Sequence, residues 1–174
     1  GVPSGLSNVR SIYSSHYAFA ALKEDGTVAA CGESSSGGSR VPSGLSNVRV
    51  IYSTCSAFAA LKEDGTVAAW GSSYYGGSGV PSGLSNVRAI YSTHYAFAAL
   101  REDGTVAAWG EASHGGSRVP SGLSNVRAIY STRCAFDALK EDGRVTAGVG
   151  SRTVGSETPT GLRRERGIHH TLDG

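Results

Sequence analysis

Three side chains that could bind a metal recur at one spacing along this sequence. His16, Cys55 and His94 each follow two hydroxyl residues, and successive members of the set are 39 residues apart. Imidazole and thiolate groups are common zinc ligands, but a structural zinc site needs about four closely placed ligands, usually including a local pair. Here each side chain belongs to a different repeat, so we expect them to be too far apart for a metal site. We expect no metal and no cofactor.

Recognisable catalytic motifs are missing from the sequence. There is no G-x-S-x-G nucleophile elbow, no phosphate-binding P-loop and no dinucleotide fingerprint. The acidic residues lie mostly in repeated Glu-Asp-Gly turns, where solvation explains them and where the ligand spacing of calcium loops is absent. An enzyme would need a pocket with convergent titratable groups, and no such set is evident, so we predict that the protein is not an enzyme.

Aromatic and imidazole side chains gather in two loops that vary between copies of the repeat. One loop contains His94 and Tyr95, and the other contains Tyr74 and Tyr75 in one copy and His114 in the next. Loops tolerate sequence changes more readily than strands, so this variation needs no functional explanation. Alternatively, equivalent loops share one rim and form a surface of the residue types that anchor protein partners. This second interpretation makes all five residues candidates for partner binding.

An internal repeat positions these loops. The segment VPSGLSNVR recurs at intervals of 39 residues, beginning at Val2, Val41, Val80 and Val119. Residues 1–157 therefore hold four units, which cover 2–40, 41–79, 80–118 and 119–157. Residues 158–174 stay in phase and are interpreted as a degenerate start of a fifth repeat. A fixed period of about 20 to 50 residues indicates a solenoid, a propeller or another repeat array.

Each unit is predicted to contain three short strands. In the third unit they cover Val87 to Tyr91, Ala96 to Leu100 and Thr105 to Trp109. An Asp-Gly pair joins the last two and signals a hairpin, because glycine accepts the positive φ of a tight turn. A helix is the alternative, since Ala, Leu, Arg and Glu favour helices. The segment is too short to form a stable helix alone and lacks a capping signal, so strands are favoured.

Both faces of the predicted strands carry apolar side chains, with Phe97 and Trp109 set among alanines. Small residues beside large ones let twisted sheets pack face to face, and a single three-stranded unit buries too little surface to fold alone. The sequence therefore predicts an all-β, propeller-type array of about four blades plus a partial fifth, in the form of an incomplete propeller or open arc. Such an array exposes a blade face and strand edges at its ends, so we also expect self-association.

The segment AALREDGTVAAWG, followed by a Gly-containing loop and a V-P-x-G-L-x-x-V opening, resembles the repeats of the regulator of chromosome condensation (RCC1) family. The resemblance covers residues 2 to about 157, and Trp70-Gly71 and Trp109-Gly110 carry the complete Trp-Gly ending. It implies a β-propeller, commonly with about seven blades. Repeats of 39 residues are most similar to the compact variant, as in β-lactamase inhibitory protein II.

The sequence departs from the family pattern at two places. The family's His-Ser pair before Ala-Leu is replaced by Ala18-Phe19 and its equivalents, and the usual G-Q-L-G loop is replaced by Gly-Gly-Ser. Any role of that histidine is therefore absent. Because members of this family act in many contexts, the resemblance implies a binding scaffold and no particular partner.

Composition limits the class of partner. The net charge is +2, and each unit carries both basic and acidic residues, whereas a nucleic-acid track needs clustered unpaired Lys and Arg. The longest apolar runs are too short to cross a membrane. We therefore expect neither a nucleic-acid nor a membrane partner. Three cysteines without a C-x-x-C pair argue against a disulfide framework and favour a reducing compartment, cytoplasmic or nuclear.

The sequence thus predicts a protein-binding or scaffold module whose partner it does not specify. The copies are nearly identical and the pattern decays after residue 143, which is also compatible with a duplicated sequence without specific function. An enzyme or a metal-binding propeller is the remaining alternative. Because there is no Met, we expect the sequence to be a fragment or a processed product.

Overall fold

The computed structural model describes residues 6–149, which form four antiparallel sheets of three strands each. Every sheet contains the three strands of one repeat in sequence order, so each repeat forms one blade. The bounds in the first two blades are β1 (Val9–Ser14), β2 (Ala18–Lys23), β3 (Val28–Gly32), β4 (Val48–Ser53), β5 (Ala57–Lys62) and β6 (Val67–Gly71). Those in the last two are β7 (Val87–Ser92), β8 (Ala96–Arg101), β9 (Val106–Gly110), β10 (Val126–Ser131), β11 (Phe136–Lys140) and β12 (Val145–Val149).

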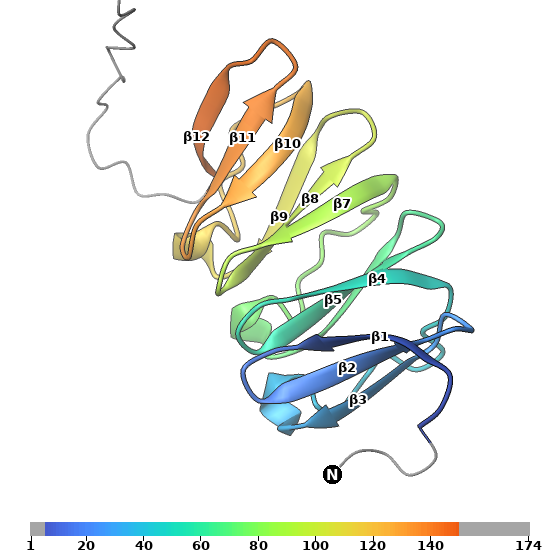
Figure 1. Cartoon of the computed structure of the whole chain (residues 1–174). Helices are drawn as coiled ribbons and strands as arrows, with labels where there is room; N and C mark the ends of the chain where they lie inside the picture. Colours follow the sequence, from blue (N-terminus) through green and yellow to red (C-terminus); the bar gives the residue numbers. More distant parts are fainter. Residues whose placement is uncertain (1–5, 150–174) are drawn as a thin grey trace, which may run out of the picture.

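The blades are stacked in chain order, and the first and fourth lie at opposite ends of the stack (Figure 1). The predicted all-β, propeller-type array of four blades is therefore confirmed, and the stretch YAFAALREDG is strand and turn rather than helix. The predicted strands of the third unit agree with β7, β8 and β9 to within one residue at each end. The predicted start of a fifth repeat lies outside the described residues.

Each second strand turns back into the third through the Glu-Asp-Gly sequence. In the second blade, the Gly65 N–H donates to the Lys62 carbonyl over 3.0 Å, and the Lys62 N–H donates to the Thr66 carbonyl over 3.0 Å. Gly65 has φ +75°, a left-handed conformation that glycine adopts without steric cost. This is a three-residue hairpin loop in which a glycine follows the tight turn.

The blades pack through unlike faces. Side chains alternate between the two faces of a strand, so Ala57, Ala59 and Leu61 of β5 share one face, which packs on Phe97 and Trp109 of the third blade. The same contact joins the first blade to the second and the third to the fourth, although Gly148 stands at the Trp109 position in the fourth. Each interface therefore joins an Ala-x-Ala-x-Leu face to a face built around phenylalanine.

The tryptophans also tie each blade to the loop of the blade before it. Trp70 Nε1 donates to the Gly37 carbonyl and Trp109 Nε1 donates to the Gly76 carbonyl, both over 3.0 Å. The two indoles stack on Phe58 and Phe97, with ring centroids 5.3 Å apart in each pair. Each buried indole N–H is thus paired, as a buried polar group requires.

Hydrogen bonds at both ends of the first strands link successive blades. The guanidinium groups of Arg10, Arg49 and Arg88 each donate to the carbonyl of the equivalent arginine in the next blade, over 2.9, 3.0 and 2.8 Å. At the other end of the strands, the N–H groups of His16, Cys55 and His94 donate to the carbonyls of Cys55, His94 and Arg133. The repeated arginine, which composition alone presents as a solvated charge, therefore connects the blades.

No helix within residues 6–149 is long and apolar enough to cross a membrane. Cys31, Cys55 and Cys134 are all free thiols.

Candidate functional site: an aromatic rim

The candidate residues lie on two kinds of loop at the same end of the blades. One is the turn between the first and second strands of a blade, which holds His94 and Tyr95 between β7 and β8. The other follows the third strand and forms a short 3-10 helix, η1 (Ser34–Ser36), η2 (Ser73–Tyr75) or η3 (Ala112–His114).

Hydroxyl groups hold the two loops of a blade together. Thr54 Oγ1 donates to the Tyr75 carbonyl over 2.8 Å, and Thr93 Oγ1 donates to the His114 carbonyl over 3.0 Å. Both threonines are buried, with exposures of 6% and 4%. In the second and third blades, the threonine at the start of the first loop thus holds the 3-10 helix of the second loop in position.

All five candidate residues meet in one cluster, which we call the aromatic rim: Tyr74, Tyr75, His94, Tyr95 and His114. Tyr95 is central, with its ring centroid 5.1 Å from that of Tyr75, in a stacked arrangement, and 4.2 Å from that of His114. The Tyr74 centroid is 5.2 Å from that of Tyr75, and the His94 centroid is 6.3 Å from that of Tyr95. The rim therefore joins side chains from the second and third blades into one surface.

The rim is open to solvent but supported from below. Tyr74 is 52% exposed, and the other four side chains are half-buried. Tyr75 packs against the core between the second and third blades. His114 Nδ1 lies 2.9 Å from Ser113 Oγ, which in turn donates to Glu111 Oε1 over 3.0 Å. The rings are thus held in place without being covered.

A shallow cavity of about 420 Å³ lies beside the rim and is lined by His16, Cys55, His94 and Arg133 among serine and threonine residues. The expectation of a large separation was wrong for His16 and His94, because their ring centroids are only 6.2 Å apart. Within residues 6–149, however, no three His, Cys, Asp or Glu side chains form a group that could hold a metal ion. Burial raises the pKa of the Cys55 thiol, which keeps it protonated and makes it a poorer ligand.

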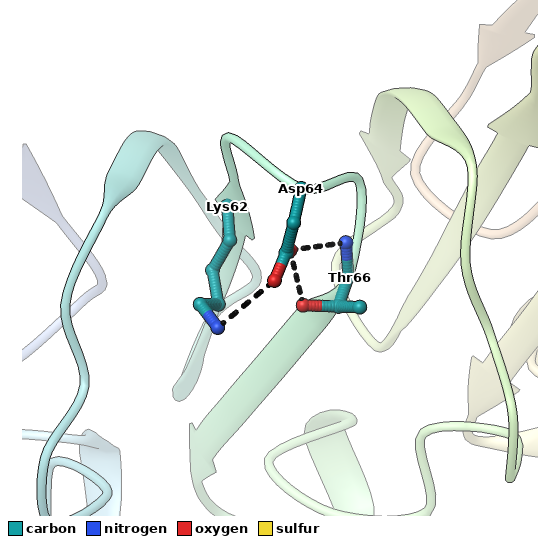
Figure 2. A network of polar contacts seen from close by, with 3 residues as sticks. All are labelled: Lys62, Asp64 and Thr66. Atoms are coloured by element: carbon teal, nitrogen blue, oxygen red, sulfur yellow. Dashed lines mark hydrogen bonds and ion pairs between the residues drawn. The ribbon is translucent and has the colours of Figure 1, made fainter.

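The Glu-Asp-Gly turns lie at the other end of the strands. In the second blade, Asp64 Oδ1 accepts hydrogen bonds from the N–H and the hydroxyl of Thr66, over 2.9 and 2.6 Å. Lys62 Nζ lies 3.3 Å from Asp64 Oδ2. Figure 2 shows the three residues and these contacts. The Thr66 hydroxyl, then its N–H, lower the pKa of Asp64 from 3.8 to about 2. The sequence analysis explained these carboxylates by solvation alone, although aspartate side chains in turns often accept a hydrogen bond from the backbone two residues further on.

We expect Thr66→Val to raise the pKa of Asp64 from about 2 towards 3.8, because it removes the hydroxyl donor and leaves the N–H in place. A carboxyl whose pKa is lowered by folding stabilises the fold above the unfolded pKa, and this contribution is lost as the pH falls through the folded pKa. For Asp64 the loss falls between about pH 4 and pH 2. NMR titration of the side-chain carboxyl measures the change.

Asp103 is the internal control for this titration, because it accepts the same bonds from Thr105 in the next blade. Its pKa should remain lowered in the Thr66→Val variant. An unchanged Asp64 midpoint would show that the hydroxyl is not the main cause of the shift.

Comparison with known proteins finds likeness in structure only. No protein-family model matches the chain, and no curated protein is similar to it in sequence. The fold is similar to that of yeast RCC1 (Prp20) in its complex with Kap60, with 19% identity, a TM-score of 0.60 and coverage of 82% of this chain and 44% of the other. It is also similar to the ectodomain of the Physcomitrella patens receptor kinase CR4, with 18% identity, a TM-score of 0.60 and coverage of 87% and 41%.

The computationally designed protein Ika4 is similar over most of its own length, with 19% identity, a TM-score of 0.51 and coverage of 84% of this chain and 93% of the other. The chain spans less than half the length of the two natural proteins. At these identities the similarity shows the fold alone. This fold is the one that the resemblance of the repeats to the RCC1 family implies. This protein is therefore a propeller-like repeat array of three-stranded blades, similar in fold to RCC1 and to receptor ectodomains.

Proposed function

We propose that this protein is a protein-binding scaffold that contacts its partner through the aromatic rim. The observation that carries the proposal is the contact of all five rim side chains, which come from separate loops of two repeats. These loops are also the places where the otherwise similar repeats differ.

Aromatic and imidazole side chains suit this role for a physical reason. They offer a large contact area and have few rotatable bonds to immobilise, so truncating a buried one at an interface often costs about 2 kcal/mol or more. The rim side chains already rest on one another and on the core, which reduces the ordering required on binding. The exposed carboxylates of the Glu-Asp-Gly turns contribute less, about 0 to 1 kcal/mol each when paired.

The alternatives predict different behaviour. A duplicated sequence without function predicts no partner whose binding depends on the rim, and an enzyme predicts turnover that depends on titratable groups. Yeast RCC1 (Prp20), which is similar in fold, has been solved bound to the protein Kap60, and this supports a protein as the class of partner.

Matched alanine variants test the proposal. Partners retained by the wild-type chain in a pull-down should be identified, and their affinities for each variant should then be measured by calorimetry. We expect Tyr74→Ala and Tyr95→Ala each to weaken binding roughly 30-fold, which corresponds to about 2 kcal/mol. Glu102→Ala and Asp103→Ala should change it by no more than a few-fold.

Tyr130→Ala is the control for loss of an aromatic side chain, because Tyr130 is 62% exposed and lies on β10 outside the rim. It should leave the affinity unchanged. Equal losses from the rim and the turn variants, or larger losses from the turn variants, would place the binding surface at the other end of the blades and refute the proposal.

A further inference from the structure

The shallow cavity beside the aromatic rim is formed by the same short segment of all four blades. In each blade this segment includes the end of the first strand or the start of the turn that follows it. The cavity volume of about 420 Å³ falls in the range of roughly 300–1,000 Å³ that is typical of small-molecule sites. Binding of a protein through the rim does not by itself require this cavity.

Backbone hydrogen bonds between blades hold the wall of the cavity in place. The N–H groups of His16, Cys55 and His94 donate to the carbonyls of the next blade over 2.9, 3.0 and 3.0 Å. Cys55 stands between the two histidines in this order, and its small side chain is only 8% exposed. The imidazoles of His16 and His94 therefore meet across it, with ring centroids 6.2 Å apart. The fold thus brings both rings to one side of the cavity before any ligand binds.

The cavity is lined by hydrogen-bond donors and carries positive charge. Apart from Cys55, its described lining consists of serine, threonine, His16, His94 and Arg133, and none of these residues is acidic. The Arg133 guanidinium has a fixed charge and a fork of N–H donors. Burial raises the pKa of the Cys55 thiol and the Arg133 charge opposes this effect, so the charge acts across the cavity as far as the second blade. Such a lining favours an anionic ligand.

We propose that this cavity binds a phosphate group, with Arg133 as the main charged donor and His16 and His94 as further donors. A phosphate group has several strongly accepting oxygens that point in different directions, which suits donors from three separate blades. A carboxylate has its two oxygens in one plane and is matched by a single arginine fork.

The phosphate belongs either to a small phosphate ester or to a phosphorylated side chain of a protein partner. In the second case the proposal rests on the function proposed for the rim. The two surfaces are continuous, because His94 lines the cavity and also contacts Tyr95 of the rim.

Titration of the full chain with inorganic phosphate at constant pH, followed by NMR spectra of the histidine side chains, tests the site. We expect saturable changes at His16 and His94 that sodium chloride at matched ionic strength does not reproduce. Arg133→Gln should weaken phosphate binding at least about tenfold, as expected for loss of hydrogen bonds from a charged group. Arg133→Lys keeps the charge but loses the fork, so it should retain part of the affinity.

Arg127→Gln is the charge-matched control, because Arg127 is exposed near the start of β10 and Arg133 follows the end of the same strand. It should bind phosphate like the wild type. Both arginines join the blades through their backbone carbonyls, which the substitutions leave in place, so both variants should fold. Acetate should bind the wild type at least about tenfold more weakly than phosphate, since it accepts fewer hydrogen bonds.

Two further probes distinguish the sources of the phosphate. Phenyl phosphate represents a small ester, and a degenerate library of phosphoserine peptides represents a protein partner. Peptides retained more tightly than phenyl phosphate, with a loss on Tyr74→Ala, assign the site to a phosphorylated partner. Equal binding that does not depend on Tyr74 assigns it to a small ester.

The test separates this site from the rim, because Tyr74 does not line the cavity and Tyr74→Ala should leave the binding of inorganic phosphate unchanged. The proposal is overturned if phosphate causes no saturable change at the histidines. It is also overturned if Arg133→Gln and Arg127→Gln weaken binding equally, or if acetate binds as tightly as phosphate.

Discussion

Replacing Phe97 by alanine is expected to lower the free energy of unfolding by about 3–5 kcal/mol, the range measured for buried phenylalanines. Phe97 is 0% exposed, stacks on Trp109 and packs on the Ala-x-Ala-x-Leu face of the second blade. Domains are typically stable by only about 5–15 kcal/mol, so this loss is a large share of the total. Urea denaturation followed by circular dichroism measures it.

The repeat supplies a matched control for this experiment. Phe19 occupies the same position in the first blade but is 54% exposed, so Phe19→Ala should cost no more than about 1 kcal/mol. Both variants should be measured at a protein concentration at which the chain is monomeric. Equal losses at the two positions would mean that packing between blades does not determine stability. If the alanine variant does not fold, Phe97→Leu should be measured instead, because it leaves a smaller cavity.

Gly110→Ala is expected to destabilise the protein by about 2–5 kcal/mol, which combines backbone strain with overpacking. Gly110 has φ +110°, and a Cβ atom there would lie 2.6 Å from the Tyr95 carbonyl oxygen and 2.8 Å from the Ala96 Cα. Both neighbours are backbone atoms and cannot rotate away. The Tyr95 carbonyl also accepts the Glu111 N–H over 3.0 Å, so the change should disturb the rim as well as the fold.

The control for Gly110 is Gly83, which has φ +71° but no neighbouring heavy atom within 4 Å of the position that a Cβ atom would take. Gly83→Ala should show backbone strain alone, about 1 kcal/mol. Denaturation curves of the two variants separate strain from steric clash. If both cost the same, the close approach at Gly110 carries no energetic penalty.

The strands and their turns could be predicted from sequence because their causes are local. Alternating side chains set the faces of Ala96–Arg101, and Gly104 permits the turn that follows it. The 3-10 helices after the third strands were not predicted, since their residues vary from Ser34–Ser36 to Ala112–His114 without a common helix signal. They depend instead on longer-range contacts, such as the one from Thr93 to the His114 carbonyl.

The candidate site could be predicted in part. Differences between repeats pointed to the loops of Tyr74, Tyr95 and His114, and the structure brings these loops together. Their role in binding stays a prediction. The distance between His16 and His94 was misjudged because they are two repeats apart in sequence, and the close approach of the first strands in successive blades cannot be seen in the sequence.

The sequence by itself determined the period of 39 residues, the three strands of each repeat and the all-β class, because alternation and turn chemistry act over a few residues. Only the tertiary structure decided which contacts form between repeats. Phe19 and Phe97 have the same local sequence, yet one is exposed and the other buried, because burial depends on whether another blade packs on that face. Likewise Trp109 reaches the Gly76 carbonyl, and Arg88 the Arg127 carbonyl, only because stacking places one blade against the next.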